Sequence, residues 1–525
     1  MARYELLAGN FLEHAAKWHP RAEVVTGAGA DTAAERVDYA ALRERAGRLS
    51  GAFAALGLGT GDRVATLAWN SAAHMECWYA AFGVGVSCHT LNPRLGVAQL
   101  AEMVRQANDR MLVASPDLGD AVAELVAACP SIERVVILDE PGGDEHALPD
   151  CGVIPVMRLA ELRETGADTK WGGFGEDTEA VLCFTSGTTG APNGVPYTHR
   201  ANYLVTLALL QTDVMAISAA DTILAAVPMF HANAWGLPFA APAVGARLVL
   251  PCRHNDGASL ARLIRDEGVT IAVGVPTVWL ALIDHLDATG EETPSLQRVI
   301  LGGSSIPQAL MDRIEARLGV RAQTTWGMTE LAPLGTVTPA SAPVRSAGKS
   351  GKPPVGVDLR LAGEDGVPLA EQRGVEGHLH VRGASVIERY LGADADAGDA
   401  AGWFATGDLA RFDEGGNLSI TGRAKDLIKS GGEWINPGEM EAIVGALPAV
   451  GLVAVVGKPD PKWTERPVVV IEAKAGEAVS DAEVVAALRE KVPRWWLPDE
   501  IVRVERMPLA GTGKIDKQTL RKRFA

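Results

Sequence analysis

The chain has 525 residues, of which 47% are hydrophobic and 22% charged, and its formal net charge is −16 at pH 7. This composition is ordinary for a globular protein, and the length predicts three or four domain-sized units. The negative charge argues against nonspecific binding to nucleic acid or to an anionic membrane. An anionic substrate would therefore be bound by local positive charge and backbone dipoles.

Over the first 340 residues, short apolar runs alternate with amphipathic segments. This alternation predicts parallel sheets covered by helices, and the number of elements predicts at least two sheets. The expected strands are 62–68, 110–114, 135–138, 180–184, 224–227, 247–250, 271–275 and 298–301, and the expected helices are 72–83 and 119–128.

The pattern changes after about residue 340, where strand-like runs follow one another without a long helix. Residues 352–361 and 378–381 predict a small, mainly antiparallel β subdomain. A further α/β unit follows, with residues 422–426 as the expected hinge. Its expected strands are 450–457, 466–473 and 500–504, and its expected helices are 438–446 and 481–491. We therefore expect an N-terminal domain over 1–424 and a C-terminal domain over 425–525.

The cysteines form no C-x-x-C pair and no Cys/His cluster with the spacing of a metal site. Most lie in apolar runs, so we expect buried thiols in a reducing compartment. The sequence contains neither the apolar core of a signal peptide near its start nor an 18-residue apolar run. These features predict a cytoplasmic protein without a membrane span. The cysteines are Cys77, Cys88, Cys129, Cys151, Cys183 and Cys252.

The most informative segment is 185–194, Thr-Ser-Gly-Thr-Thr-Gly-Ala-Pro-Asn-Gly, which follows an expected strand. Its glycines let the backbone approach a ligand, and successive N–H groups in such a turn form an anion-binding concavity. The Walker signature is absent, so this is a different kind of phosphate loop. On its own, the segment is also compatible with a flexible surface loop.

Two further segments suit a nucleotide and its metal. Residues 324–330, Thr-Thr-Trp-Gly-Met-Thr-Glu, place a carboxylate beside a hydroxyl on an expected turn, and hard cations such as Mg²⁺ prefer oxygen ligands. Residues 301–305, Leu-Gly-Gly-Ser-Ser, follow a strand and leave room for a planar ring where open α/β sheets bind ligands. Seen alone, each is equally typical of an ordinary turn.

Single side chains complete the candidate site. Asp408 suits the two hydroxyls of a ribose, and Arg423 would balance its charge. His231 and Trp235 follow an apolar strand and would line a substrate entry. Lys514 lies in a glycine-containing loop that could deliver its ammonium into a cleft. Each of these residues, taken alone, is more often structural or solvated.

Taken in this order, the segments resemble the adenylate-forming superfamily, which includes acyl-CoA synthetases, nonribosomal adenylation domains and firefly-type luciferases. The resemblance runs from about residue 10 to residue 522. Asn92-Pro-Arg-Leu and Phe230-His-Ala-Asn-Ala-Trp-Gly are most similar to bacterial short- to medium-chain acyl-CoA ligases of the 3-methylthiopropionyl-CoA ligase type. The superfamily resemblance implies an α/β fold. It comprises a large N-terminal domain of two parallel-type α/β subdomains plus a small β subdomain, and a small mobile C-terminal α/β domain.

The resemblance also implies the roles of the matching residues. The cofactors and co-substrates would be ATP, Mg²⁺ and coenzyme A, and the substrate would be a small carboxylic acid. A homodimer is a common assembly in the superfamily. Lys514 would bridge the α-phosphate and the carboxylate, Thr329 would touch the α-phosphate, Thr185 and Glu330 would hold Mg²⁺, and His231 would complete the catalytic set. The implied nucleotide and CoA residues are Thr185, Ser186, Gly187, Thr188, Thr189, Gly190, Asn193, Gly302, Gly303, Ser304, Thr324, Thr325, Trp326, Gly327, Met328, Asp408, Arg423, Lys425, Lys429, Gly431, Gly432, Glu433 and Lys514, and the acyl residues are His231, Trp235, Gly303, Trp326 and Gly327.

One position departs from the family pattern, because Asn193 stands where the phosphate loop usually has lysine. A charged hydrogen bond is worth about 1.5–3 kcal/mol against about 1 kcal/mol for a neutral one. We therefore expect the catalytic efficiency with ATP to be roughly tenfold lower than it would be with lysine at this position.

The sequence leaves the acyl substrate open. The bulk of Trp235 and Trp326 favours short or medium acyl groups. An aromatic-acid CoA ligase and an acyl-AMP transferase that loads a carrier protein use the same machinery. A nucleotide-binding pseudo-enzyme, suggested by Asn193, is the non-enzymatic alternative.

Overall fold

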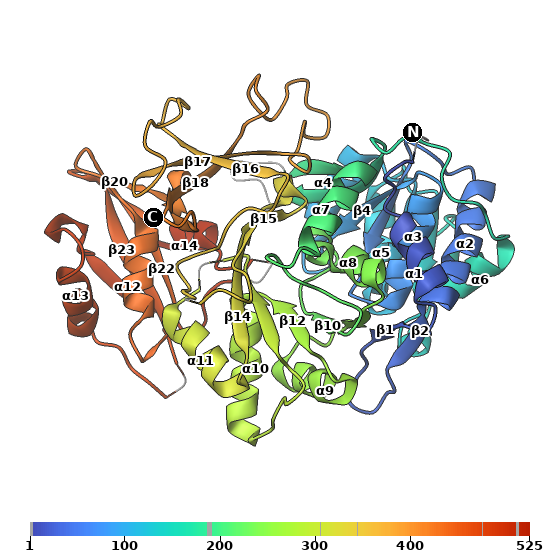
Figure 1. Ribbon diagram of the computed structural model, residues 1–525, viewed down its shortest axis with the longest axis horizontal. Helices are drawn as coiled ribbons and strands as arrows, with labels where there is room; N and C mark the ends of the chain where they lie inside the picture. Colours follow the sequence, from blue (N-terminus) through green and yellow to red (C-terminus); the bar gives the residue numbers. More distant parts are fainter. Residues whose placement is uncertain are drawn as a thin grey trace.

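The computed structural model describes residues 4–185, 192–304, 306–343, 345–474, 476–510 and 514–524. These residues form four sheets, of seven, eight, four and five strands. Figure 1 shows the first two sheets in the blue to yellow part of the chain and the last two in its orange and red part.

The seven-stranded sheet has the order β7-β6-β5-β3-β4-β8-β9. Its strands are parallel except at the edge, where β9 pairs antiparallel with β8. The phosphate-loop segment connects these two strands. The strands are β3 (Arg63–Leu67), β4 (Ser87–Leu91), β5 (Met111–Ala114), β6 (Arg134–Ile137), β7 (Val156–Arg158), β8 (Glu179–Thr185) and β9 (Asn193–Thr198); the associated helices are α2 (Tyr39–Ala55), α3 (Ala72–Gly83), α4 (Val97–Ala107), α5 (Gly119–Ala128), α6 (Leu159–Thr165) and α7 (His199–Leu209).

The eight-stranded sheet has the order β15-β14-β13-β12-β10-β11-β1-β2. It is parallel from β14 to β1 and antiparallel at both edges. The strands are β1 (Glu23–Thr26), β2 (Glu35–Asp38), β10 (Thr222–Ala225), β11 (Arg247–Leu250), β12 (Ile271–Gly274), β13 (Arg298–Leu301), β14 (Arg321–Gly327) and β15 (Leu334–Val337); the helices are α1 (Asn10–Trp18), α8 (Leu237–Val244), α9 (Gly257–Glu267), α10 (Pro276–Thr289) and α11 (Gln308–Leu318).

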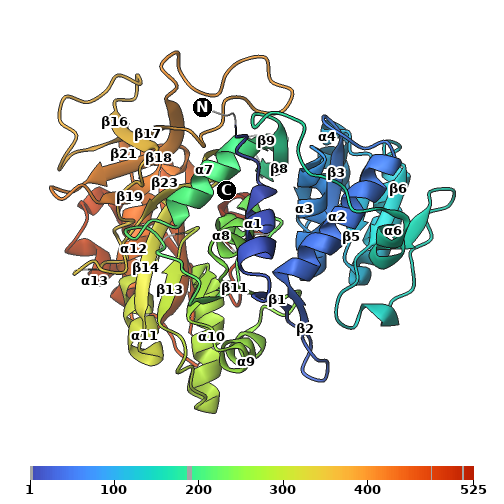
Figure 2. The same cartoon turned by 45° about the vertical axis from the view of Figure 1, so that its right-hand side comes forward.

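The main core lies between these two sheets. It combines Val64 and Val113 of the seven-stranded sheet with Ile223 and Val273 of the eight-stranded sheet. All residues of α3 are buried in it, and Figure 2 shows α1 and α8 between the two sheets. Separate clusters beneath α4 and α5, and beneath α9, α10 and α11, cover the outer faces. The arrangement is therefore five layers, helix–sheet–helix–sheet–helix, and it places the carboxyl ends of both sheets near one another.

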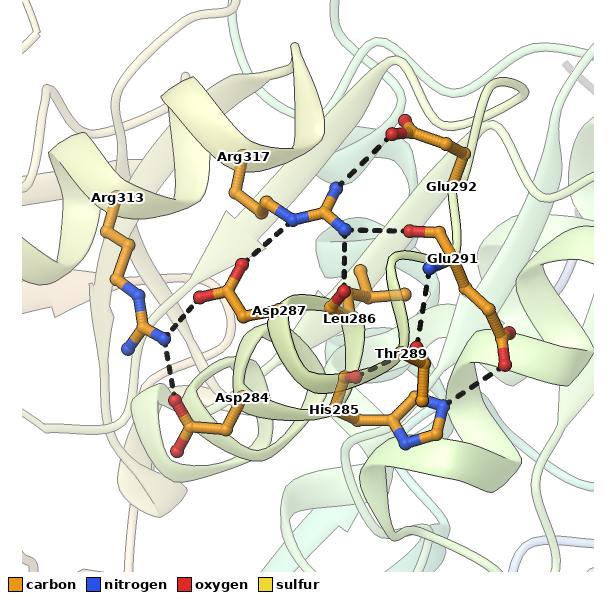
Figure 3. Close-up of polar contacts among 9 residues, drawn as sticks. All are labelled: Asp284, His285, Leu286, Asp287, Thr289, Glu291, Glu292, Arg313 and Arg317. Carbon is orange, nitrogen blue, oxygen red and sulfur yellow. Dashed lines mark hydrogen bonds and ion pairs between the residues drawn. The ribbon is translucent and has the colours of Figure 1, made fainter. Parts of the chain in front are cut away.

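Two arginines join α11 to α10 (Figure 3). Arg313 Nη2 binds Asp284 Oδ1 at 2.8 Å and Asp287 Oδ2 at 2.6 Å, while Arg317 Nε binds Asp287 Oδ1 at 2.9 Å. Arg317 Nη2 also donates to the carbonyl of Leu286 at 2.8 Å, in the last turn of α10, where the same carbonyl accepts the N–H of Gly290. Isolated exposed ion pairs stabilise little, but this shared network fixes the helix that follows the Gly302–Ser304 segment.

The remaining sheets are smaller. The four-stranded sheet is antiparallel in the order β16-β17-β18-β19, and the five-stranded sheet contains β21-β20-β23-β22 with β24 parallel to β23. The expected α/β class and its smaller β unit are confirmed, whereas the domain boundary at 424/425 stays a prediction. The elements are β16 (Val357–Ala362), β17 (Glu376–Gly383), β18 (Phe404–Phe412), β19 (Leu418–Arg423), β20 (Ile428–Ser430), β21 (Glu433–Ile435), β22 (Val450–Asp460), β23 (Thr464–Ala473), β24 (Glu500–Arg503), α12 (Pro437–Gly445), α13 (Asp481–Arg489) and α14 (Lys517–Phe524).

Two local expectations are wrong. The strand expected over 352–361 begins only at Val357, after two prolines at 353 and 354 that cannot donate to a strand ladder. The turn expected over 324–330 is instead the end of β14 followed by the short helix η4 (Thr329–Leu331). Tertiary pairing with β13 and β15 extends the strand through Gly327.

Candidate active site

Two edge hairpins bring the first site residues together. Thr185 ends β8 and pairs with Asn193, which begins β9, so the phosphate-loop segment is held at its two ends. Residues Ser186, Gly187, Thr188, Thr189 and Gly190 lie outside the described residues. The hairpin β14–β15 carries Thr329 and Glu330 in its connection. Glu330 is 8% exposed, so the structure holds a carboxylate in a largely buried position.

Two tyrosines fix the backbone and side chain of this second connection. The Tyr390 hydroxyl donates to Glu330 Oε1 at 3.0 Å, and the buried Tyr197 hydroxyl donates to the carbonyl of Thr329. The backbone N–H of Leu391 donates to the carbonyl of Gly194 at 2.9 Å, so the segment of Tyr390 and Leu391 contacts both the β14–β15 connection and the start of β9. Sequence analysis missed Tyr390, because nothing in its local sequence places it beside Glu330.

Asp408 is held by two donors. Arg423, its cross-strand partner on β19, binds Oδ1 through Nε at 2.7 Å, and Trp326 donates its indole N–H to Oδ2 at 2.8 Å. The Asp408 side chain is 2% exposed, and this burial raises its pKa, opposed chiefly by the positive charge of Arg423. The expected pairing of Asp408 with Arg423 is thus present, whereas the contact of Trp326 with Asp408 was not expected.

The hydroxyls of the two threonines before Trp326 are occupied by structural hydrogen bonds. Thr324 Oγ1 contacts Thr338 Oγ1 at 2.7 Å, and Thr325 Oγ1 donates to the carbonyl of Thr336 at 2.7 Å. The hydroxyl hydrogens of both threonines are used in this way, because Thr324 Oγ1 also donates to the carbonyl of Lys349, so these hydroxyls could contact a ligand only as acceptors. Met328 donates its N–H to the carbonyl of Pro333 at 3.1 Å, which closes the β14–β15 connection.

Gly302 and Gly303 lie where several elements meet. A Cβ on Gly302 would lie 2.5 Å from Thr325 Cγ2 and 3.1 Å from Trp235 Cη2, so a side chain there would clash. Gly303 has φ of +83° and faces both Trp235 and Lys514: a Cβ there would lie 3.6 Å from Trp235 Cζ2 and 3.7 Å from Lys514 Cε. The glycines thus leave space into which the indole and the lysine fit. Ser304 is exposed next to them.

Lys514 reaches this region from the C-terminal part of the chain. Burial, and then the positive charge of Arg423, lowers its pKa, while the carboxylates of Asp408 and Glu330 act in the opposite direction. Its carbonyl accepts the N–H of Ala510 at 2.7 Å. The structure therefore brings Glu330, Asp408 and Lys514 together, although Asp408 lies 78 positions after Glu330 and Lys514 lies 106 positions after Asp408.

His231 belongs to the same neighbourhood. Burial, and then repulsion from Lys514, lowers the pKa of His231 to about 4. The imidazole is therefore neutral near pH 7 and can offer one donor and one acceptor without adding charge.

The remaining predicted residues lie apart from this cluster. Lys429 donates its backbone N–H to Glu465 at 2.9 Å, its ammonium lies 5.4 Å from the centre of the Trp434 ring, and Gly431 donates to the carbonyl of Trp463 at 2.8 Å. These partners all belong to the five-stranded sheet region, as do Gly432 and Glu433. Lys425 lies in the short helix η5 (Ala424–Asp426), between β19 and β20.

The family of the chain follows from comparison with known proteins. Residues 12–391 match the model of the AMP-binding enzyme family, and residues 439–514 match that of the AMP-binding enzyme C-terminal domain. The chain belongs to the AMP-binding enzyme family. The expected superfamily and enzyme class, an AMP-forming acyl-CoA synthetase, are confirmed.

Two relatives match this chain along nearly their whole lengths. A medium-chain-fatty-acid–CoA ligase from Ectopseudomonas oleovorans is 39% identical, with 100% of this chain and 97% of that protein covered. A 3-methylmercaptopropionyl-CoA ligase from Ruegeria lacuscaerulensis is also 39% identical, with 100% and 98% covered.

Solved structures share the fold. The ATP-bound MatB structure from Rhodopseudomonas palustris has a TM-score of 0.86 at 24% identity, with 99% of each chain covered. The anthranilate CoA ligase AuaEII in complex with anthranoyl-AMP has a TM-score of 0.88 at 23% identity, with 99% of this chain and 98% of that chain covered.

Proposed function

We propose that this chain activates a short- to medium-chain carboxylic acid with ATP, transfers the acyl group to coenzyme A, and releases AMP and pyrophosphate. The observation that carries the proposal is the meeting of Lys514 with Glu330, Asp408, Gly303 and Trp235. The names of the two relatives favour a fatty acid of medium length or 3-methylthiopropionate as the acid. Trp235 beside Gly303 also favours a small acyl group over a long one.

The physical difficulty of the first step is that one anion attacks another. The carboxylate oxygen forms a bond to the α-phosphorus, and the bond to the pyrophosphate oxygen breaks in line with it. Lys514 would lie between the carboxylate and the α-phosphate and lower their repulsion in a site with little water. Asp408 would accept hydrogen bonds from the ribose hydroxyls, with Arg423 and Trp326 holding its two oxygens.

Glu330 suits a hard divalent cation such as Mg²⁺, because it is a largely buried carboxylate oriented by the hydroxyl of Tyr390. Thr185 would supply a second oxygen at the end of β8. The cation would offset the negative charge of the triphosphate.

The second step requires space where Lys514 lies. The sulfur of the CoA thiolate attacks the acyl carbon, and AMP leaves with the electron pair of the broken acyl–phosphate bond. We propose that the C-terminal domain, over about 425–525, turns near Lys425 and withdraws Lys514. That motion would bring Lys429 and Gly431–Glu433 toward the acyl-adenylate, where they would border the path of the pantetheine arm.

Two other properties are proposals of the same kind. The chain would work in the cytoplasm, and it would form a homodimer, which is common in the superfamily that it resembles. Among the described residues, no helix is both long enough and apolar enough to cross a membrane.

A panel of carboxylic acids tests the function. The purified protein is supplied with ATP, Mg²⁺ and coenzyme A, and AMP release is followed for straight-chain, 3-methylthio and aromatic acids. We expect the highest kcat/KM among acids of about three to eight carbons. A preference for aromatic acids, or activity only with a phosphopantetheinylated carrier protein in place of CoA, would favour the alternative ligase classes. ATP binding without any acid-dependent AMP or pyrophosphate release would indicate a pseudo-enzyme.

A further inference from the structure

The backbone of Lys514 is bonded to the segment just before it and leads directly into the last helix. The carbonyl of Lys514 accepts the N–H of Ala510 at 2.7 Å, and the N–H of Asp516 donates to the carbonyl of Pro508 at 2.8 Å. The helix α14 begins at Lys517, three positions after Lys514. Whatever fixes α14 therefore also fixes the backbone from which the Lys514 ammonium extends.

Asp516 begins this helix and joins it to the Lys514 segment. Its Oδ1 accepts the N–H of Thr519 at 3.0 Å and its Oδ2 accepts the hydroxyl of Thr519 at 2.7 Å, as in a helix N-cap. The helix lies beside β22 (Figure 1), and its Leu520 is fully buried in one apolar cluster with Val456 and Val468. Because the capping residue lies two positions after Lys514, a shift of α14 would shift the lysine.

Two ion pairs hold one side of α14. Arg521 Nη2 binds Asp426 Oδ1 at 2.6 Å, and Lys517 Nζ binds Glu441 Oε1 of α12 at 2.7 Å. Lys517 and Arg521 are four positions apart, so they lie on the same face of the helix. The side chains of Asp426 and Glu441 are only 15% and 18% exposed, so solvent screens these pairs less than it screens pairs on the open surface.

The pair of Arg521 with Asp426 connects two places that the proposed mechanism needs to move together. Asp426 directly follows Lys425, where the turn of the C-terminal domain is proposed, and both belong to η5. Arg521 lies 95 positions further along the chain, in the helix that follows Lys514. Through this contact, a rotation at Lys425 would reach the lysine directly and not along the intervening chain.

We propose that the ion pair of Arg521 with Asp426 makes α14 and the residue after the pivot move as one body, so that a turn at Lys425 carries Lys514 to and from its place beside the acid and the α-phosphate. Both are positioning residues, because they act through Lys514. This inference rests on the proposed function and deepens it, since it names the contact that transmits the domain turn to the lysine.

Arg521→Gln tests the inference, because it removes the charge and keeps most of the length of the side chain. A displacement of about 1 Å at a reacting group can lower a rate by about 100-fold, so we expect acid-dependent pyrophosphate release to fall by roughly tenfold or more. The rate at which supplied acyl-AMP is converted to the CoA thioester should stay within about threefold of the wild type, since Lys514 acts in the first step only. The amides of 514–520 should exchange hydrogen faster than in the wild type.

A double-mutant cycle shows whether the two side chains act through their contact. Asp426→Asn should lower pyrophosphate release by a similar factor and repeats the test if Arg521→Gln does not fold. Combining both substitutions should cost no more than about threefold beyond either one alone, because they remove the same interaction. Arg521→Lys should retain pyrophosphate release to within about threefold of the wild type, because the contact to Asp426 uses a single nitrogen.

A matched control pair lies in the same part of the chain. Lys458 Nζ of β22 binds Glu500 Oε2 of β24 at 2.9 Å, but both side chains are about half exposed and neither adjoins Lys425 or α14 in the sequence. Lys458→Gln should therefore match the wild type in both half-reactions and in the hydrogen exchange of 514–520.

The outcomes separate the inference from the proposed function. Unchanged pyrophosphate release in a folded Arg521→Gln or Asp426→Asn variant, an equal loss in both half-reactions, or fully additive losses in the double variant would overturn the inference. A wild-type protein that releases no pyrophosphate with any acid would instead overturn the proposed function. In that event, hydrogen exchange of 514–520 that is identical in the wild type and in Arg521→Gln would overturn the inference as well.

Discussion

The two sides of the candidate site are built in different ways. On the N-terminal side, Asp408 is fixed by Arg423 and Trp326, and Glu330 by Tyr390, through hydrogen bonds of 2.7 to 3.0 Å. On the C-terminal side, the carbonyl of Lys514 accepts the N–H of Ala510, and its side chain lies beside Gly303. Charges act on Lys514 at a distance, and its burial lowers its pKa.

This difference fits the proposed turn of the C-terminal domain, in which Lys514 leaves the site while Asp408 and Glu330 stay. Groups that define the ribose and metal positions are locked by partners from neighbouring strands. A residue that must withdraw between two steps gains from weak docking, because each strong contact would have to be broken in every turnover. The four predictions below test this contrast.

Lys514→Ala should have the largest effect. Removing one charged donor at a developing negative charge typically lowers a rate by about 100- to 1,000-fold, and we expect that loss in acid-dependent pyrophosphate release. Thioester formation from supplied acyl-AMP should change by less than about threefold, because in the proposed mechanism the lysine has withdrawn before that step. Lys522→Ala, at an exposed lysine of α14, is the matched control and should match the wild type in both assays. Equal loss of the two half-reactions would show that the lysine is not confined to the first.

Trp326→Phe tests the locked side. It leaves Asp408 without one of its two donors, and a hydrogen bond to a charged group is worth about 1.5–3 kcal/mol. We expect KM for ATP to rise by roughly tenfold or more in the adenylation half-reaction. Trp171→Phe, which removes an indole donor to Ser50 far along the chain from the site residues, serves as control. If KM for ATP is unchanged in Trp326→Phe while only acid selectivity shifts, Trp326 acts on the acyl group alone.

Asn193→Lys should increase the catalytic efficiency with ATP. It would place a charge at the first residue of β9, where the loop rejoins the sheet, and gain about 1–2 kcal/mol toward phosphate. We expect kcat/KM for ATP to rise by up to about tenfold. Gln211→Lys adds the same charge at an exposed position and should leave kcat/KM for ATP unchanged. A fall in activity would mean that the loop here requires the neutral amide.

The smallest effect concerns pH and the docking of Lys514. Burial, followed by the charge of Arg423, lowers the lysine pKa when it is docked, so the docked arrangement binds fewer protons than the withdrawn one. The docked arrangement should therefore become more stable relative to the withdrawn one as pH rises from the lowered pKa toward the ordinary lysine pKa. Below that range, docking bears the full free-energy penalty that corresponds to the lowered pKa. The radius of gyration from small-angle X-ray scattering between pH 7 and pH 9.5 would report this shift. The dependence should disappear in Lys514→Met; an identical dependence in that variant would assign it to other groups.

Much of the fold could be predicted from local patterns. The strands over 247–250 and 298–301 and the helices over 72–83 and 119–128 begin and end where expected. The two strands and the first helix are largely buried apolar runs, and the second helix is amphipathic, with Val122, Leu125 and Val126 buried. Ser71, for example, caps α3 by accepting the N–H of His74. The end of β14 could not be predicted, since its extension through Gly327 depends on a partner strand about ten residues further along the chain.

The site was only partly predictable. The spacing of glycines and hydroxyls, together with the superfamily resemblance, indicated Glu330, Asp408, Arg423 and Lys514. The contact of Tyr390 with Glu330 could not be found in this way, because the two residues lie 60 positions apart and no local pattern links them. Residues 232–235 all have positive φ, and the only sign of this in the sequence was the asparagine at 233. The alanines on either side of it gave no indication of positive φ.

The sequence by itself determined the family, the alternating α/β architecture and the chemical types of the groups that meet a nucleotide. These depend on short-range periodicity and on motifs whose residues are neighbours in the chain. Only the tertiary structure decided which groups donate hydrogen bonds to Asp408 and how Trp235 packs against Gly302 and Gly303. It also decided that Lys514 lies beside these glycines. Those outcomes depend on strands and domains that are distant in sequence, and their packing sets backbone conformations and pKa values that no local pattern contains.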